Sequence, residues 1–309
     1  MRKIAFIVVL LIAWTVSEAK NARQNGGHAF EATIGAGYAS LGYDVNDLTP
    51  NLHANTVGSY GLQAHIGYNW FFSKYLGVAV GVDAHHYGQK TALSGTLVWN
   101  GVTDTDGERY EHRLQLDKWN EQQDCWTVEI PLSLVFAFPI PDKCSITAQI
   151  GGKFGLPLSA TYNGYGTLIH TGYYEPWNLV LSDKPNHGFY TERDFKPKGQ
   201  FRNKNYWTVF AKAGVTLPLA EHLDLLVQLY ANYALTSLAD EGQNEVLGFR
   251  NDRPGQEQNH YFMSNYTDLH NTPVITDRFK PWDIGLEIGI RYTISSHKHQ
   301  YPCRCLGVR

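Results

Sequence analysis

The sequence predicts an all-β fold: an eight-stranded antiparallel transmembrane β-barrel with short periplasmic turns and long extracellular loops. Apolar and polar residues alternate with a period of two along the chain, and helical periodicity is nearly absent after the first segment. The connections between the alternating segments are short and long in turn. Aromatic residues gather beside two of the short connections, where a membrane interface would lie.

Composition excludes several other classes of protein. The chain has 309 residues, of which 43% are hydrophobic and 18% charged, and this argues against disorder. With 26 Lys and Arg against 29 Asp and Glu there is no basic field, so nucleic acid is not an expected partner. No apolar run reaches the roughly 18 residues that a spanning helix needs. A helical membrane protein is therefore excluded.

The first residues have the pattern of a secretory signal peptide. Arg2 and Lys3 precede an apolar run over residues 4–14, and small residues follow up to Ala19. We therefore expect a signal peptide at 1–19, the barrel at 20–294 and a short periplasmic tail at 295–309.

Four strands are predicted by clean alternation, at 61–72, 76–83, 223–232 and 282–294. Four more alternate less regularly, at 30–43, 126–138, 145–161 and 206–219. Pro131 and Pro157 fall inside two of these, and proline cannot donate to a strand ladder. We expect a bulge or a strand end at each proline.

The connections support a membrane barrel over a secreted soluble β-sandwich or lipocalin-like barrel. Short connections fall at 73–74, 139–143 and 218–222, and long loops are expected at 44–57, 89–124, 165–204 and 239–280. The apolar faces end in a predicted aromatic girdle. Its members are Tyr68, Trp70, Phe72, Tyr75, Phe136 and Phe138.

If the apolar face meets lipid, the other face lines the lumen. The lumen would then hold a charge network of five acids and three bases. These are Glu31, Asp83, Glu129, Lys153, Lys212, Asp224, Glu287 and Arg291. Cross-lumen pairing is expected, because an unpaired buried charge is costly. The pairs either plug or gate the barrel, or simply fill and specify its interior.

Few residues suggest chemistry, and we predict no catalytic residue, metal or cofactor. Asp83 and His85 share a strand face while His86 points the other way, and no motif marks a partner serine. The tail at 297–305 has two His and two Cys, but their spacing matches no standard zinc framework. Cys125 and Cys144 flank one strand and should lie too far apart to pair.

Two predicted loops are rich in aromatic residues. Segment 165–204 has Tyr173, Tyr174, Trp177, Phe189, Tyr190 and Phe195, and segment 239–280 has Phe249, Tyr261, Phe262 and Tyr266. Such residues suit a recognition surface for an extracellular protein or glycan. They could equally pack on one another above the barrel. The sequence leaves both interpretations open.

Four stretches carry a family resemblance, at residues 128–132, 151–158, 213–215 and 280–286. They resemble the N-terminal transmembrane barrel of Bacteroidetes OmpA-family outer membrane proteins and related porin-like barrels, over roughly residues 28–294. The resemblance implies an eight-stranded barrel with periplasmic termini and surface loops. Family members with the full architecture continue into a periplasmic peptidoglycan-binding domain, whereas only about fifteen residues follow Ile294 here, so peptidoglycan is not an expected partner. Many outer-membrane barrels also end on an aromatic residue, and this chain does not.

The predicted function is that of a non-enzymatic protein in outer-membrane lipid, structural or acting as an interaction surface through its loops. A small porin is the first alternative, and an outer-membrane lipid- or peptide-modifying enzyme is the second.

Overall fold

The computed structural model describes residues 27–42, 52–104, 106–140, 144–196, 198–200, 203–238 and 279–294. Three predicted segments lie outside these residues: the signal peptide, nearly all of segment 239–280 and the tail at 295–309. The aromatic residues of segment 239–280 and the His and Cys residues of the tail therefore lie outside them as well. In the part described, no helix is both long and apolar enough to cross a membrane.

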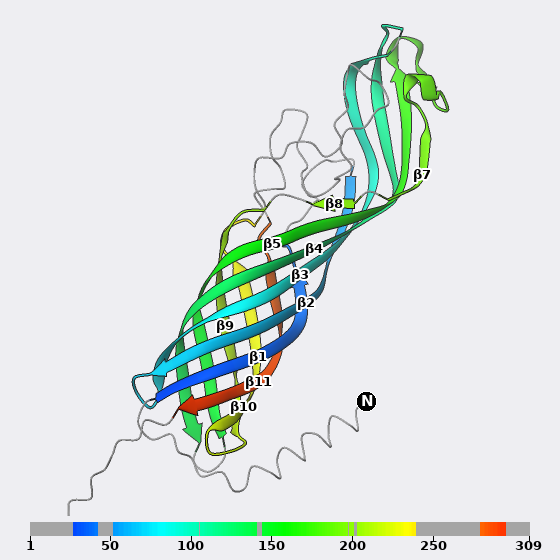
Figure 1. Cartoon of the computed structure of the whole chain (residues 1–309). Helices are drawn as coiled ribbons and strands as arrows, with labels where there is room; N and C mark the ends of the chain where they lie inside the picture. Colours follow the sequence, from blue (N-terminus) through cyan, green and yellow to red (C-terminus); the bar gives the residue numbers. More distant parts are fainter. Residues whose placement is uncertain are drawn as a thin grey trace, which may run out of the picture.

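Eight antiparallel strands close into a barrel (Figure 1). They are β1 (Gly27–Ser40), β2 (Leu52–Phe71), β3 (Leu76–Thr103), β4 (Arg109–Ile140), β5 (Cys144–Tyr174), β9 (Tyr206–Pro218), β10 (Leu223–Ala234) and β11 (Trp282–Ile294). Each pairs with the next, and β11 pairs with β1, so the barrel has no free edge. The predicted fold is confirmed, and the last strand has the predicted bounds.

Five short elements follow β5 before the chain returns to the barrel. They are the 3₁₀ turns η2 (Glu175–Trp177) and η3 (Pro185–His187) and the strands β6 (Leu179–Leu181), β7 (Thr191–Phe195) and β8 (Lys198–Gln200). All three short strands pair with β5.

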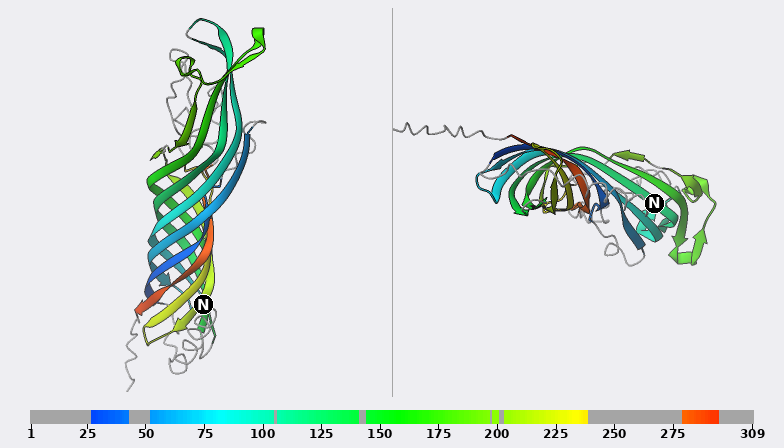
Figure 2. Two further views of the ribbon diagram at one scale, coloured as in Figure 1. Left: turned by 90° about the vertical axis from the view of Figure 1, so that its right-hand side faces the viewer. Right: turned by 90° about the horizontal axis from the view of Figure 1, so that it is seen from below.

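The prediction of loops at 89–124 and 165–204 is wrong, because β3, β4 and β5 continue far past the other strands (Figure 1). The first part of β2, predicted as loop, pairs with β3 up to Gly95. We call residues 52–58, 89–124 and 160–200 the extension. Register shifts near Gly95 and Lys118, which has a φ of +51°, break the alternation that marks a strand in sequence. Figure 2 shows the extension continuing beyond the barrel.

The two prolines behave differently. The β4–β5 register shifts beside Pro157, so the predicted bulge is confirmed there. At Pro131 the prediction is wrong, since β4 continues and pairs this residue with Lys153. The β3–β4 ladder keeps its register on both sides of Pro131 and is interrupted only at Ile130 and at the proline itself, which has no N–H to donate.

The outer surface of the barrel is an apolar belt between two aromatic rows. The predicted girdle lies at the short-turn end, where Trp70, Phe72, Tyr75 and Phe138 are about half exposed. A second row at the opposite end was not predicted and consists of Tyr38, Tyr60, Trp126, Trp207 and Tyr233. On β2 the belt runs from Tyr60 to Trp70, which matches the roughly 9–11 residues of a transmembrane strand. The barrel is therefore built to span a membrane.

Candidate functional site

The lumen contains all eight charged residues that parity assigned to it, and each side chain is buried. Arg291, Lys153, Asp83 and Glu129 have no exposed surface, and Asp224 is the most exposed of the eight at 8%. They come from strands all around the barrel, and the contacts between them run from strand to strand around its inner wall.

Most of these charges belong to one chain of contacts that alternates in sign. It begins with Arg291 on β11, whose guanidinium donates to Oε2 of Glu31 at 3.0 Å. Oε1 of Glu31 lies 3.2 Å from Nε2 of His65 on β2. The other ring nitrogen of His65, Nδ1, contacts Oδ1 of Asp83 on β3. Four neighbouring strands, β11, β1, β2 and β3, are thereby joined along the inner wall of the barrel.

The chain of contacts continues through a buried lysine. Nζ of Lys153 on β5 lies 2.8 Å from Asp83 and 3.1 Å from Oε2 of Glu129 on β4. The same Glu129 oxygen lies 3.6 Å from Nδ1 of His85, whose Nε2 is 2.9 Å from Asp283 on β11. The alternation therefore returns to the strand on which it began.

Both ring nitrogens of His65 are hydrogen-bonded to carboxylates, whereas only Nε2 of His85 is, with its Nδ1 3.6 Å from Glu129. Each ring presents both nitrogens to carboxylate oxygens. A neutral imidazole donates from one nitrogen only, whereas the protonated ring donates from both. The His65 ring, bonded through both nitrogens, therefore adds positive charge to a lumen in which acids outnumber lysine and arginine.

The remaining predicted charges lie beside this chain of contacts. Lys212 donates to Oε2 of Glu287 at 3.0 Å, and Gln63 donates to the same oxygen at 2.6 Å. Asp224 stands opposite Arg291 in the β10–β11 register. Neutral hydroxyl and amide groups also donate hydrogen bonds to several of the carboxylates. Two of these donors are the hydroxyls of Tyr87 and Tyr206, which both donate to Glu129.

Sequence reasoning missed three members of the network, namely His65, His85 and Asp283. Asp283 has the same parity on β11 as Glu287 and Arg291, so the alternation that found those two could have found it. The histidines share parity with Asp83 or with their lumen-facing neighbours on β2. The two histidines were missed because the predicted lumen charges included only Asp, Glu, Lys and Arg.

The Asp83 and His85 pair considered for catalysis does not form. Both side chains point into the lumen, but Asp83 contacts His65 and Lys153, while His85 contacts Glu129 and Asp283. His86 lies on the opposite face, as expected. Its ring stacks on Tyr60 with centroids 5.0 Å apart.

An apolar layer lies directly above the charged lumen. Along β4 the inward residues change from Glu129 to Cys125 and then Trp119, and Trp119 is 1% exposed. Leu41, Leu238 and Phe279, from the ends of three other barrel strands, complete this layer and are fully buried. Cys125 and Cys144 are both free, as expected.

The extension has its own aromatic core. Tyr110, Tyr174 and Phe189 pack together, with the two tyrosine rings stacked at 5.4 Å. Of the six aromatics predicted in segment 165–204, five make such packing contacts or are partly buried. Trp177 also stacks on Tyr174, but it is 56% exposed. For this segment the packing interpretation is confirmed, and Trp177 is the most exposed of the six.

Burial shifts the pKa of ionisable groups in the extension. It lowers the pKa of His112 to about 3, helped by the charge of the neighbouring His170, so His112 is neutral. Burial also raises the pKa of the Tyr110 hydroxyl, and the nearby Asp104 carboxylate adds to the shift. Tyr110 therefore stays protonated and remains a donor.

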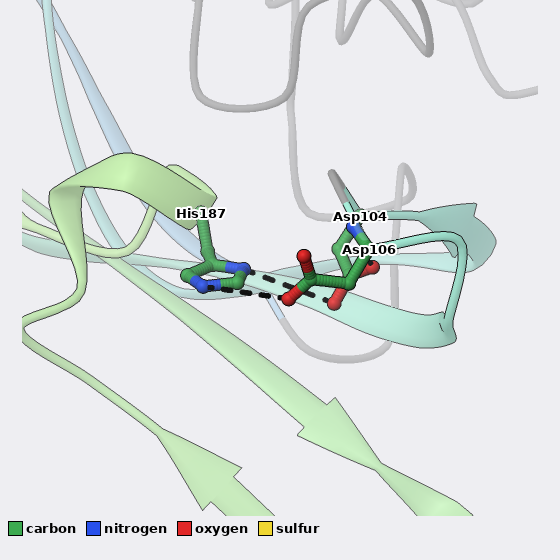
Figure 3. A group of neighbouring side chains, drawn as sticks. All are labelled: Asp104, Asp106 and His187. Atoms are coloured by element: carbon green, nitrogen blue, oxygen red, sulfur yellow. Dashed lines mark hydrogen bonds and ion pairs between the residues drawn. The ribbon is translucent and has the colours of Figure 1, made fainter.

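One group of side chains in the described ranges could hold a metal ion: Asp104, Asp106 and His187, at the far end of the extension (Figure 3). Sequence analysis did not predict it. The two aspartates stand alone in the short turn between β3 and β4, and the histidine follows β5, so no local spacing reveals the group.

No family model and no curated protein matches the chain. Among solved structures it is similar to the outer membrane protein OprG from Pseudomonas aeruginosa (11% identity, 89% of this chain and 98% of that chain, TM-score 0.37). It is also similar to Neisserial surface protein A (10%, 87% and 97%, 0.33) and to Ail of Yersinia pestis in complex with the heparin analogue sucrose octasulfate (7%, 86% and 98%, 0.29). At these values the fold assignment rests on the strand pairing itself, and membership of the OmpA family stays a prediction.

Proposed function

We propose that this chain is a non-enzymatic outer-membrane protein with a closed barrel that holds the extension at the cell surface as an interaction module. The observation that carries the proposal is the lumen, where buried ion pairs join strands that are not neighbours, such as β3 with β5 and with β11, and an apolar layer lies above them. An eight-stranded barrel is just wide enough for side chains to fill it.

The extension supports the second half of the proposal. Three strands continue past the membrane belt, although a barrel needs only short loops there. At the far end the exposed side chains include Trp177, Leu179 and Val180, at 56%, 44% and 51%. Exposed aromatic and aliphatic groups beside polar loops suit contact with an extracellular protein or glycan.

Single-channel conductance in a planar bilayer tests the closed lumen. The wild-type protein should give no steady conductance. Replacing Lys153, Lys212 and Arg291 together by methionine should open a pore, because repulsion between the remaining carboxylates would disperse the network. A paired variant, Lys212→Met with Glu287→Met, removes both charges of one ion pair and leaves neither partner uncompensated. It replaces the triple variant in the conductance measurement if the triple variant fails to fold.

A steady wild-type pore would overturn the closed barrel in favour of the porin alternative. The enzyme alternative is tested by Asp83→Asn in lipid and protease assays. An activity present in the wild type and lost in a folded Asp83→Asn variant would contradict the non-enzymatic assignment.

Cysteine labelling in intact cells tests the surface position of the extension. In a background with all four native cysteines replaced by serine, Asn186→Cys in the exposed turn η3 should react with a membrane-impermeant maleimide. Ser73→Cys, in the short turn at the other end of the barrel, is the matched control and should react only after permeabilisation. The reverse pattern would overturn the proposed orientation.

A further inference from the structure

The turn between β3 and β4 holds one carboxylate in a fixed position. Oδ1 of Asp104 accepts from the backbone N–H groups of Asp106 and Glu108, each at 2.9 Å. Its other oxygen, Oδ2, accepts from the Tyr174 hydroxyl at 2.6 Å. The Asp104 side chain is 4% exposed.

A histidine from a different segment faces this carboxylate (Figure 3). His187 ends the turn η3, which is held by hydrogen bonds from His187 N–H to Lys184 and from Gly188 N–H to Pro185. Phe189, fully buried in the extension core, fixes the chain immediately after it. Nδ1 of His187 lies 3.8 Å from Oδ2 of Asp104, and Nε2 lies 4.0 Å from Oδ2 of Asp106.

These separations are too long for hydrogen bonds but suit groups that share an ion. One potential ligand atom from each residue lies within 4.8 Å of the others. Ligands about 2.1 Å from a tetrahedral ion lie roughly 3.4 Å apart, so a small contraction is needed. Asp106, whose side chain is 73% exposed, is free to rotate inward and supply it.

Two buried polar atoms point to a missing ligand. Nδ1 of His187 is buried and makes no hydrogen bond within the described ranges. The hydroxyl of Tyr110, a residue only 2% exposed, likewise has no partner there. Its ring stacks on Tyr174, whose hydroxyl donates to Asp104, so Tyr110 is in contact with the residue that holds this carboxylate. Buried donors and acceptors are almost always paired in folded proteins.

We propose that Asp104, Asp106 and His187 bind a divalent first-row transition metal, with Zn²⁺ as the type ion, at the far end of the extension. One imidazole and two carboxylates are ligands that suit this class. Calcium takes six to eight oxygen ligands, and an imidazole in so small a set disfavours it. Tyr174 positions Asp104, and the Tyr110 hydroxyl is placed to donate to water on the ion. The site joins the β3–β4 turn to the segment after β5.

Isothermal titration of Zn²⁺ into the refolded full-length protein, stripped with a chelator, tests the proposal. The wild type should bind one more Zn²⁺ than His187→Gln. Asp106→Asn should weaken binding at this site about 10-fold or more without affecting folding, since the side chain is exposed. His222→Gln, in the short turn at the other end of the barrel, is the matched control and should bind as the wild type does.

A variant of the supporting residue separates a built site from a chance cluster. Tyr174→Phe keeps the stacked ring but removes the donor to Asp104, and should weaken binding about 10- to 100-fold. Any metal bound by residues 295–309 contributes equally to every variant and cancels. Unchanged stoichiometry and affinity in both His187→Gln and Asp106→Asn would overturn the proposal. This result is independent of the conductance test.

Discussion

Strands β3, β4 and β5 pass through two environments as one continuous sheet, first the barrel wall and then the extension. In the barrel the inward face is charged and the outward face apolar. Along β4 the outward residues Leu132, Ile130 and Trp126 are exposed to lipid, while Glu129 faces the lumen. Beyond Asp124 the outward residues are polar. The inward Gln123 and Glu121 are still polar, and from Trp119 onward most inward residues are apolar.

The change of polarity marks where the membrane ends. The same backbone face of β4 carries Glu129 inside the barrel and Leu116 or Leu114 inside the extension. A lumen surrounded by lipid has to satisfy polar groups internally, whereas an extension surrounded by water gains by burying apolar ones. Whether the outward residues of a strand are apolar or polar therefore depends on whether lipid or water surrounds it. The strands pair in the same way in both surroundings.

Two arginine–glutamate pairs, Arg291 with Glu31 in the barrel and Arg113 with Glu111 in the extension, should differ most in what they contribute to stability. Arg291→Met leaves Glu31 buried without its guanidinium, and should destabilise the barrel by about 3–5 kcal/mol. Urea unfolding in detergent micelles measures it. Met keeps the apolar stem and removes the guanidinium, so the loss reports the missing charge together with its hydrogen bonds. A change below about 1 kcal/mol would contradict the closed charge network.

The outward faces differ in the next largest amount. Leu132→Arg places a cation in the middle of the lipid belt, where its cost is about 2–4 kcal/mol. Gln122→Arg changes the same face of the same strand inside the extension, and should shift stability by less than about 0.5 kcal/mol. Refolding into lipid vesicles measures both. Equal effects would mean that the belt ends elsewhere on β4.

Acid should affect the extension through His112. Its folded pKa of about 3 lies below the ordinary value near 6.5, so the unfolded state takes up the proton first. The stability that His112 contributes is present above about pH 6.5 and is lost as the pH falls toward 3. Between pH 7 and pH 5 the loss is about 2 kcal/mol.

The groups that face His112 are His170 at 3.2 Å and the rings of Trp99, Tyr110 and Phe189. Amide hydrogen exchange along the extension strands measures the effect, with faster exchange expected at pH 5 after correction for the intrinsic rate. His112→Asn should remove the pH dependence. A variant that keeps the same slope would assign the acid sensitivity to another group.

Sequence reasoning succeeded where one environment covers a whole strand. Strand β11 lies entirely within the membrane belt, so its alternation is unbroken from Trp282 to Ile294 and its bounds were found. The charged lumen residues followed from the same parity. The extension was missed because its alternation is reversed in polarity and is shifted at Gly95 and Lys118.

The group at the far end of the extension could not be predicted for a different reason. Asp104 and His187 meet only because β4 pairs with β5 and the segment after β5 folds back over their end. Nothing in either local sequence records that pairing. Asp83 and His85, adjacent in parity and plausible as a pair, instead have separate partners across the lumen.

The second arginine–glutamate pair gives the smallest expected effect and completes the contrast. Arg113 on the outward face of the extension lies 2.5 Å from Glu111 and stacks over Tyr173 at 4.4 Å. Its side chain is 35% exposed, so water screens the pair. Arg113→Met should therefore cost about 1 kcal/mol or less, measured by hydrogen exchange in β4 and β5. The substitution is the same as at Arg291, so the difference between the two isolates the environment. A loss as large as that of Arg291→Met would mean that the outward face of the extension is covered, as it would be against a bound partner or a second copy of the chain.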